Sequence, residues 1–177
     1  MDNKRFNRRS IRLPDYDYTQ NGAYFVTICT QNRQQLFCNI DVGAGPCAGP
    51  KLSLNAIGMM VQSIWDDLPR YYPGVEIDEF IIMPDHFHGI IILTEHIGRP
   101  QGAAPTSLFD VVHRFKSLTT ARYRQNVVRH RWPPFPGRLW QRNYFERVIR
   151  NEYELDRIRQ YIRNNPIIWP DDNGWSD

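Results

Sequence analysis

The sequence lacks several features, and each missing feature excludes a class of protein. No stretch reaches the roughly 18 to 20 consecutive apolar residues of a membrane-spanning helix, and the N-terminus, MDNKRFNRRSIRLPDYDY, has no apolar secretory core. We therefore expect a cytoplasmic protein with no membrane partner. Only three cysteines are present, Cys29, Cys38 and Cys47, without a Cys-x-x-Cys pair. This spacing argues against a structural zinc site or a redox couple, and it assigns the cysteines no role.

Acidic residues are nearly absent from two segments. Residues 1–12 carry five Lys or Arg against one Asp, a net charge of +4, and residues 112–150 carry ten against one Glu, a net charge of +9. Nine of those ten cations are Arg, whose planar guanidinium matches the geometry of a phosphate group. This bias favours a polyanionic partner over its plain alternative, a solvated basic surface.

The length of 177 residues fits a single domain, and a composition of 41% hydrophobic and 13% aromatic residues is sufficient for a packed core. We expect one domain over residues 1–177, with three less regular parts. These are a basic N-terminal arm (about residues 1–20), an irregular Gly/Pro-rich loop (39–51) and a short acidic tail (170–177).

Hydrophobic periodicity predicts a mixed α+β fold. Runs rich in aromatic and β-branched residues predict strands, and apolar steps of three and four residues predict helices. The predicted strands are 22–30, 75–84, 86–93 and 139–149, and the predicted helices are 53–68 with Ser53 as cap, 107–124 with Ser107 as cap, and 151–165, which Asn165-Pro166 ends. The order β, α, β, β, α, β, α suits a ferredoxin-like antiparallel sheet with helices packed on one face.

Two histidines give the sharpest chemical signal. In the sequence His86-Phe87-His88, the two-residue period of a strand sends both imidazoles to one face and Phe87 to the other. Neutral imidazoles bind divalent metals, and a third oxygen ligand would leave positions open for substrate. Two surface histidines on an edge strand are an equal alternative on this motif alone.

A second pair of polar residues lies on the last predicted helix. Tyr161 and Asn165 are four residues apart, so they share a face beside the apolar stripe of Ile158 and Ile162. Taken alone, the tyrosine is more often a packing residue and the asparagine more often a helix stop before proline.

Three segments together resemble a known family. They are MPDHFHGIIIL (83–93), FKSLTTARYR (115–124) and LWQRNYFERVIRNEYELDRIRQYIRNNP (139–166). In this order they resemble the single-tyrosine HUH transposases, and among them most closely the REP-associated tyrosine transposases of bacteria. The resemblance implies an HUH-type α+β fold and a bacterial cytoplasmic protein.

The same resemblance implies a function and a set of site residues. His86, His88 and Asn165 would hold a divalent metal, Mg²⁺ or Mn²⁺, and Tyr161 would be the nucleophile. The protein would then be a metal-dependent endonuclease and strand transferase that cleaves single-stranded DNA near hairpins through a 5′-phosphotyrosine intermediate. Relatives work either as monomers or as homodimers, and the sequence does not choose between them.

The basic segments supply candidate contacts to single-stranded or hairpin DNA, since cations follow phosphates along a strand. The candidates are Arg8, Arg9, Arg12, Arg114, Lys116, Arg122, Arg124, Arg138 and Arg142. Two other functions stay open: a hairpin-binding protein without cleavage activity, and a small metalloenzyme unrelated to DNA.

Several neighbouring polar residues receive no catalytic role. If the strand is regular up to Asp85, that carboxylate points away from His86, so Asp85 is not expected to be a ligand. Glu76, Asp78 and Glu79 are expected on the solvated face of a strand, although they could tune a metal from a distance. Trp140 and Tyr144 are expected in the core.

Overall fold

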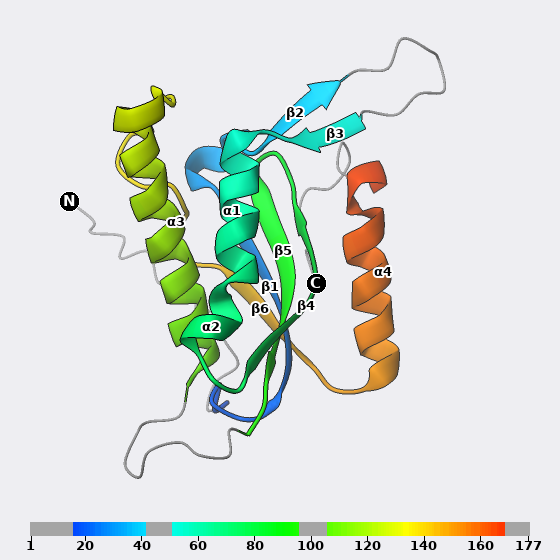
Figure 1. The fold of residues 1–177 in the computed structure, drawn as a ribbon. Coiled ribbons are helices and arrows are strands. Elements are labelled where there is room, and N and C mark those ends of the chain that lie inside the picture. Colours follow the sequence, from blue (N-terminus) through cyan, green and yellow to red (C-terminus); the bar gives the residue numbers. More distant parts are fainter. Residues whose placement is uncertain (1–15, 42–50, 96–105, 169–177) are drawn as a thin grey trace, which may run out of the picture.

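The computed structural model describes residues 16–41, 51–95 and 106–168. Its centre is a four-stranded antiparallel sheet in the order β4-β5-β1-β6 (Figure 1). The strands are β1 (Gly22–Cys29), β4 (Val75–Ile82), β5 (His86–Leu93) and β6 (Phe145–Ile149). Helices follow β1 and β5 in the chain, so the predicted ferredoxin-like α+β arrangement is confirmed.

Helices cover both faces of the sheet rather than one. In Figure 1, α1 (Ala56–Asp66), α2 (Leu68–Tyr71) and α3 (Leu108–His130) lie on one side, and α4 (Glu152–Ile168) lies on the other. The prediction of a single covered face is therefore wrong for α4. The reason is that β1 is apolar on both faces. Tyr24, Val26 and Ile28 belong to the core on the α1/α3 side, whereas Phe25 packs against Ile158 and Ile162 of α4.

The connection between β1 and α1 is more regular than expected. A short 3₁₀ turn (Gln31–Arg33) is followed by β2 (Cys38–Asp41) and β3 (Lys51–Leu54), which pair with each other. Both ends of the predicted irregular loop 39–51 are thus strand, and residues 42–50 lie outside the described parts. Ser53 belongs to β3 and does not cap α1. Asn55 caps it instead, accepting hydrogen bonds from the amides of Ile57 and Gly58.

The other two long helices begin as their sequences predict. Ser107 and Asp110 form a reciprocal capping box at the start of α3. The side chain of Asn151 accepts a hydrogen bond from the amide of Glu154 at the start of α4. The expectation that Asn165-Pro166 ends α4 is wrong, since the helix continues to Ile168. Pro166 has no amide hydrogen to donate to the carbonyl of Ile162, and the helix ends two residues after it.

The larger core lies between the sheet and the α1/α3 layer. Trp65, Phe87 and Phe115 are fully buried there, with ring centroids 4.5–5.2 Å apart. This cluster fixes β5 from the side that Phe87 faces, so the histidines on either side of Phe87 project toward α4. Among the helices that the structure describes, none is long and apolar enough to cross a bilayer.

Candidate active site

Both histidines of β5 lie beneath α4. His86 and His88 are 2% and 1% exposed, and their ring centroids are 4.6 Å apart. Phe87 points into the opposite core, as the alternation of a strand predicts. The alternative of two exposed histidines on an edge strand is wrong, because β5 is paired on one side with β4 and on the other with β1.

Each imidazole is held by a hydrogen bond at its Nδ1 atom. Thr27 Oγ1 lies 2.8 Å from Nδ1 of His88, and Asp85 Oδ1 lies 2.7 Å from Nδ1 of His86. Burial, together with the charges of His86 and Arg33, lowers the pKa of His88 well below its ordinary value of 6.5. His88 is therefore neutral near pH 7, which is the form that binds metal ions.

Helix α4 brings the tyrosine to the histidines. The hydroxyl of Tyr161 lies 3.4 Å from Nε2 of His88, and the Tyr161 ring packs edge-on against Phe25. Asn165, one turn further on, is fully buried. The spacing of four residues had placed both side chains on one face, and the structure turns that face inward. Tyr153, the other tyrosine of this helix, is 73% exposed.

Ion pairs that no local sequence pattern indicated connect α4 to β4. Arg159 binds Asp78 of β4 through Nε and Nη2, at 2.5–3.2 Å, and Arg163 binds Glu79. A β-bulge between Ile77 and Phe80 places these two acidic residues in sequence at the point where α4 crosses. The expectation that Asp78 and Glu79 are simply solvated is therefore wrong, although Glu76 is exposed.

Two imidazoles and one amide are a donor set for a divalent metal ion: the amide oxygen suits Mg²⁺ or Mn²⁺, and the imidazole nitrogens also accept Zn²⁺ and Ni²⁺. Because hydrogen bonds occupy both Nδ1 atoms, a metal ion would bind at Nε2, and in His88 that is the atom that faces the Tyr161 hydroxyl. In the parts of the chain that the structure describes, no group of three or more His, Cys, Asp and Glu side chains could hold a metal ion. Asn165 is the third candidate ligand.

Asp85 lies beside His86, and the expectation that it points away is wrong. Asp85 precedes the first residue of β5, so the alternation of the strand does not apply to it. Its carboxylate also lies 3.0 Å from Nε of Arg33, and Asp85 is only 7% exposed. Sequence position alone gave no signal for Arg33, which is 52 residues away in the chain.

Four of the basic candidates line one groove between α3 and the segment before β6. The groove has a volume of about 550 Å³. Its cationic residues are Lys116, Arg124, Arg138 and Arg142, and the hydroxyls of Ser117 and Thr120 also line it. The groove includes Trp140, which bridges to Thr30 just beyond β1 and is buried, as expected.

Lys116 has a structural role in this groove, unlike the arginines. Its Nζ donates to the carbonyl oxygens of Gln141 and Arg142, at 2.7 and 3.0 Å. Burial and the charge of Arg138 lower its pKa from 10.5 to about 8. Lys116 therefore ties the segment to α3, whereas Arg124, Arg138 and Arg142 are exposed along the groove.

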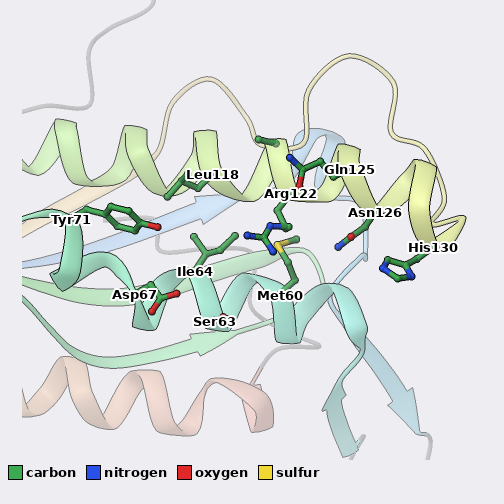
Figure 2. A pocket seen from close by; sticks show the side chains of 11 residues that line it. Met60, Ser63, Ile64, Asp67, Tyr71, Leu118, Arg122, Gln125, Asn126 and His130 are labelled. Atoms are coloured by element: carbon green, nitrogen blue, oxygen red, sulfur yellow. The ribbon is translucent and has the colours of Figure 1, made fainter.

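The remaining basic candidates lie elsewhere. Arg122 lines a separate pocket of about 480 Å³ between α1 and α3, where Figure 2 shows it beside Met60 and Ile64. Arg114 lies over the ring of Tyr71, 5.3 Å from the centroid. Arg8, Arg9 and Arg12 lie outside the described residues, as does the acidic tail.

Comparisons with known proteins agree with this geometry. The family described as "Transposase IS200 like" matches residues 61–165. An uncharacterized protein of Haemophilus influenzae is 37% identical over 184 residues, covering 97% of this chain and 94% of its own. A solved structure of a REP-associated tyrosine transposase bound to a REP hairpin has a similar fold, with a TM-score of 0.57 and 21% identity over 86% of this chain and 70% of its own. The chain therefore belongs to the IS200-like transposase family, and its function is a transposase-like action on DNA.

Proposed function

We propose that this protein is a metal-dependent endonuclease and strand transferase for single-stranded DNA, with Tyr161 as its nucleophile. One observation carries the proposal: the Tyr161 hydroxyl lies 3.4 Å from Nε2 of His88, one of two neighbouring imidazoles whose Nδ1 atoms are already hydrogen-bonded. The Tyr161 hydroxyl thus lies beside one candidate ligand nitrogen, and the ring centroid of the second histidine lies 4.6 Å from that of the first.

The reaction exchanges one phosphate ester for another. The Tyr161 oxygen attacks phosphorus, the bond from phosphorus to the 3′ oxygen breaks, and the strand remains joined to the protein as a 5′-phosphotyrosine. The proton that the phenol loses is balanced by the one that the departing 3′ oxygen gains. Because the bond energy is kept in the ester, a second 3′-hydroxyl can attack the phosphotyrosine and join the strands without ATP.

His86, His88 and Asn165 would hold the divalent ion, Mg²⁺ or Mn²⁺. When bound, such an ion neutralises charge on the nonbridging oxygens of the phosphate. The protein's own contribution is to hold the phenol in place: the ring of Tyr161 packs against Phe25 and His88, which restricts its orientation.

The substrate would be a hairpin or its single-stranded flank. The REP-associated transposase of similar fold is bound to such a hairpin, and the basic groove of this chain is suited to follow a phosphate backbone. Gln141, which lines the groove, donates its amide to the carbonyl of Cys29, and Cys29 pairs with His86 across the sheet. The groove therefore begins at the end of the sheet that carries the histidines.

The test is a denaturing gel of the protein with Mn²⁺ and a 3′-labelled oligonucleotide that contains a palindrome from its own genome, because the phosphotyrosine retains the strand on the 3′ side of the cut. We expect a protein band that carries the label in the wild type and not in Tyr161→Phe, which removes one oxygen and keeps the volume of the side chain. Tyr153→Phe is the matched control, because Tyr153 is on the same helix and 73% exposed; it should retain the band.

Two outcomes would contradict the proposal. A labelled band that persists in Tyr161→Phe would remove this tyrosine from the reaction. Hairpin binding in the wild type without any adduct would favour the function of a non-catalytic hairpin-binding protein.

A further inference from the structure

We propose that Asp85, held by Arg33, is a positioning residue that keeps the ring proton of His86 on Nδ1 and leaves Nε2 unprotonated. The effect of Asp85 on metal binding rests on the function proposed above. The position of the ring proton of His86 is independent of that function, because it is a property of the metal-free protein.

The hydrogen bond itself decides where the proton lies. The side chains of Asp85 and His86 are 10% and 2% exposed, and Oδ1 lies 2.7 Å from Nδ1. An ionised carboxylate only accepts hydrogen bonds, so Nδ1 of His86 must be the donor. In a neutral imidazole the other nitrogen, Nε2, then carries no proton and is free to act as a ligand.

Arg33 holds the other oxygen of the same carboxylate. Its Nε lies 3.0 Å from Oδ2 of Asp85, so each carboxylate oxygen has its own partner. A second nitrogen of the same guanidinium, Nη1, donates to Sγ of Cys29 at 3.0 Å. Because Cys29 pairs with His86 across the sheet, the guanidinium is anchored to the strand next to the histidine.

The backbone on both sides of this contact is unusually constrained. Asn32 and Arg33 both have positive φ angles, of 58° and 53°, a conformation that side chains with a Cβ rarely adopt. The turn that carries Asp85 is tied by Thr30, whose amide and hydroxyl both donate to the carbonyl of Asp85 at 2.9 Å. Strained residues of this kind gather at functional sites, where the surrounding structure compels them.

The two histidines are therefore held differently. His88 has the neutral hydroxyl of Thr27 at its Nδ1, and a hydroxyl can donate or accept. His86 has a carboxylate, which permits one orientation of the proton and makes the ring a better electron donor. We infer that His86 is the more strongly oriented of the two.

The first test is ¹⁵N NMR of the histidine rings in the metal-free protein at pH 8, with His86 assigned from its absence in His86→Ala. We expect the proton of His86 on Nδ1 in the wild type. In Asp85→Asn we expect it on Nε2, because Arg33 can only donate and takes the amide oxygen, which leaves the amide nitrogen to donate to Nδ1. In Asp85→Ala we expect a mixture of the two tautomers. The control is Asp67→Ala, which removes a carboxylate from an exposed pair with Arg70 and should leave the His86 signals unchanged.

The second measurement is Mn²⁺ affinity by electron paramagnetic resonance, for which we expect binding about 10- to 100-fold weaker in Asp85→Ala. A wild-type spectrum with the proton on Nε2 of His86 would overturn the proposal, even if Asp85→Ala failed to fold. Unchanged tautomer and affinity in a folded Asp85→Ala would overturn it as well. A third outcome separates the two proposals. If the wild type has the predicted tautomer but His86→Ala binds Mn²⁺ as tightly as the wild type, the positioning role is supported and the metal site of the proposed function is refuted.

Discussion

At the scale of single residues, Gly89 shows how tightly the histidine strand is packed. A Cβ at this position would lie 2.7 Å from ring atoms of both Trp65 and Phe87, which are fully buried. We expect Gly89→Ala to lower the free energy of unfolding by about 1–3 kcal/mol through overpacking. Urea denaturation measures this change. Glu76→Ala, an exposed position on the neighbouring strand β4, is the control and should change stability by less than about 0.5 kcal/mol. Equal midpoints for Gly89→Ala and the wild type would contradict the close packing.

At the scale of elements, the ion pairs between β4 and α4 decide where the tyrosine lies. The side chains of Asp78 and Arg159 are 16% and 29% exposed, and two guanidinium nitrogens bind the carboxylate. We expect Asp78→Asn to cost about 1.5–3 kcal/mol, as for a hydrogen bond to a charged group. Hydrogen exchange should show the loss mainly in the amides of α4, and the yield of labelled adduct should fall although Tyr161 is unchanged. In Asp156→Asn, which removes an exposed partner of the same Arg159, exchange should stay close to that of the wild type.

The same pair gives a pH dependence with a defined sign. The hydrogen bond from Arg159 lowers the pKa of Asp78 below its ordinary value of 3.8. A carboxyl group whose pKa is lower in the folded state stabilises that state fully above the unfolded value, and the contribution is lost as the pH falls through the folded value. The protection of α4 in the wild type should therefore approach that of Asp78→Asn below about pH 3.8. A difference that stayed constant down to pH 2 would exclude this ion pair as its cause.

At the scale of the whole molecule, the basic segment 112–150 is divided between surfaces with different surroundings. Arg124, Arg138 and Arg142 line the groove, whereas Arg122 lies in the pocket between α1 and α3. If the groove follows a single strand, each lost phosphate contact should reduce the slope of log K against log salt by about 0.7. We expect this reduction in Arg138→Ala and Arg142→Ala, and an unchanged slope in Arg70→Ala, whose side chain is 81% exposed on α2. Fluorescence anisotropy with a labelled hairpin measures the slope. If all three variants keep the slope of the wild type, the groove is not part of the DNA path.

Local periodicity in the sequence was sufficient for much of the fold and for the outline of the site. The alternation in 86–93 placed both imidazoles on one face, and the spacing of four placed Tyr161 and Asn165 on one side of a helix. Such patterns are readable because they follow from the backbone geometry of a single element, which neighbours hardly change. The cap at Ser107 was readable for the same reason, since all of its partners lie within three residues.

Contacts between elements depended on tertiary structure. Asp78 and Arg159 are 81 residues apart, Thr27 and His88 are 61 apart, and no local pattern relates the members of either pair. The face on which α4 docks, the bulge that presents Asp78 and Glu79, and the turn that brings Asp85 onto His86 follow from strand register and packing. The residue types and spacings of the sequence therefore set out the candidate chemistry, and the packing of α4 against β5 decided that those residues meet.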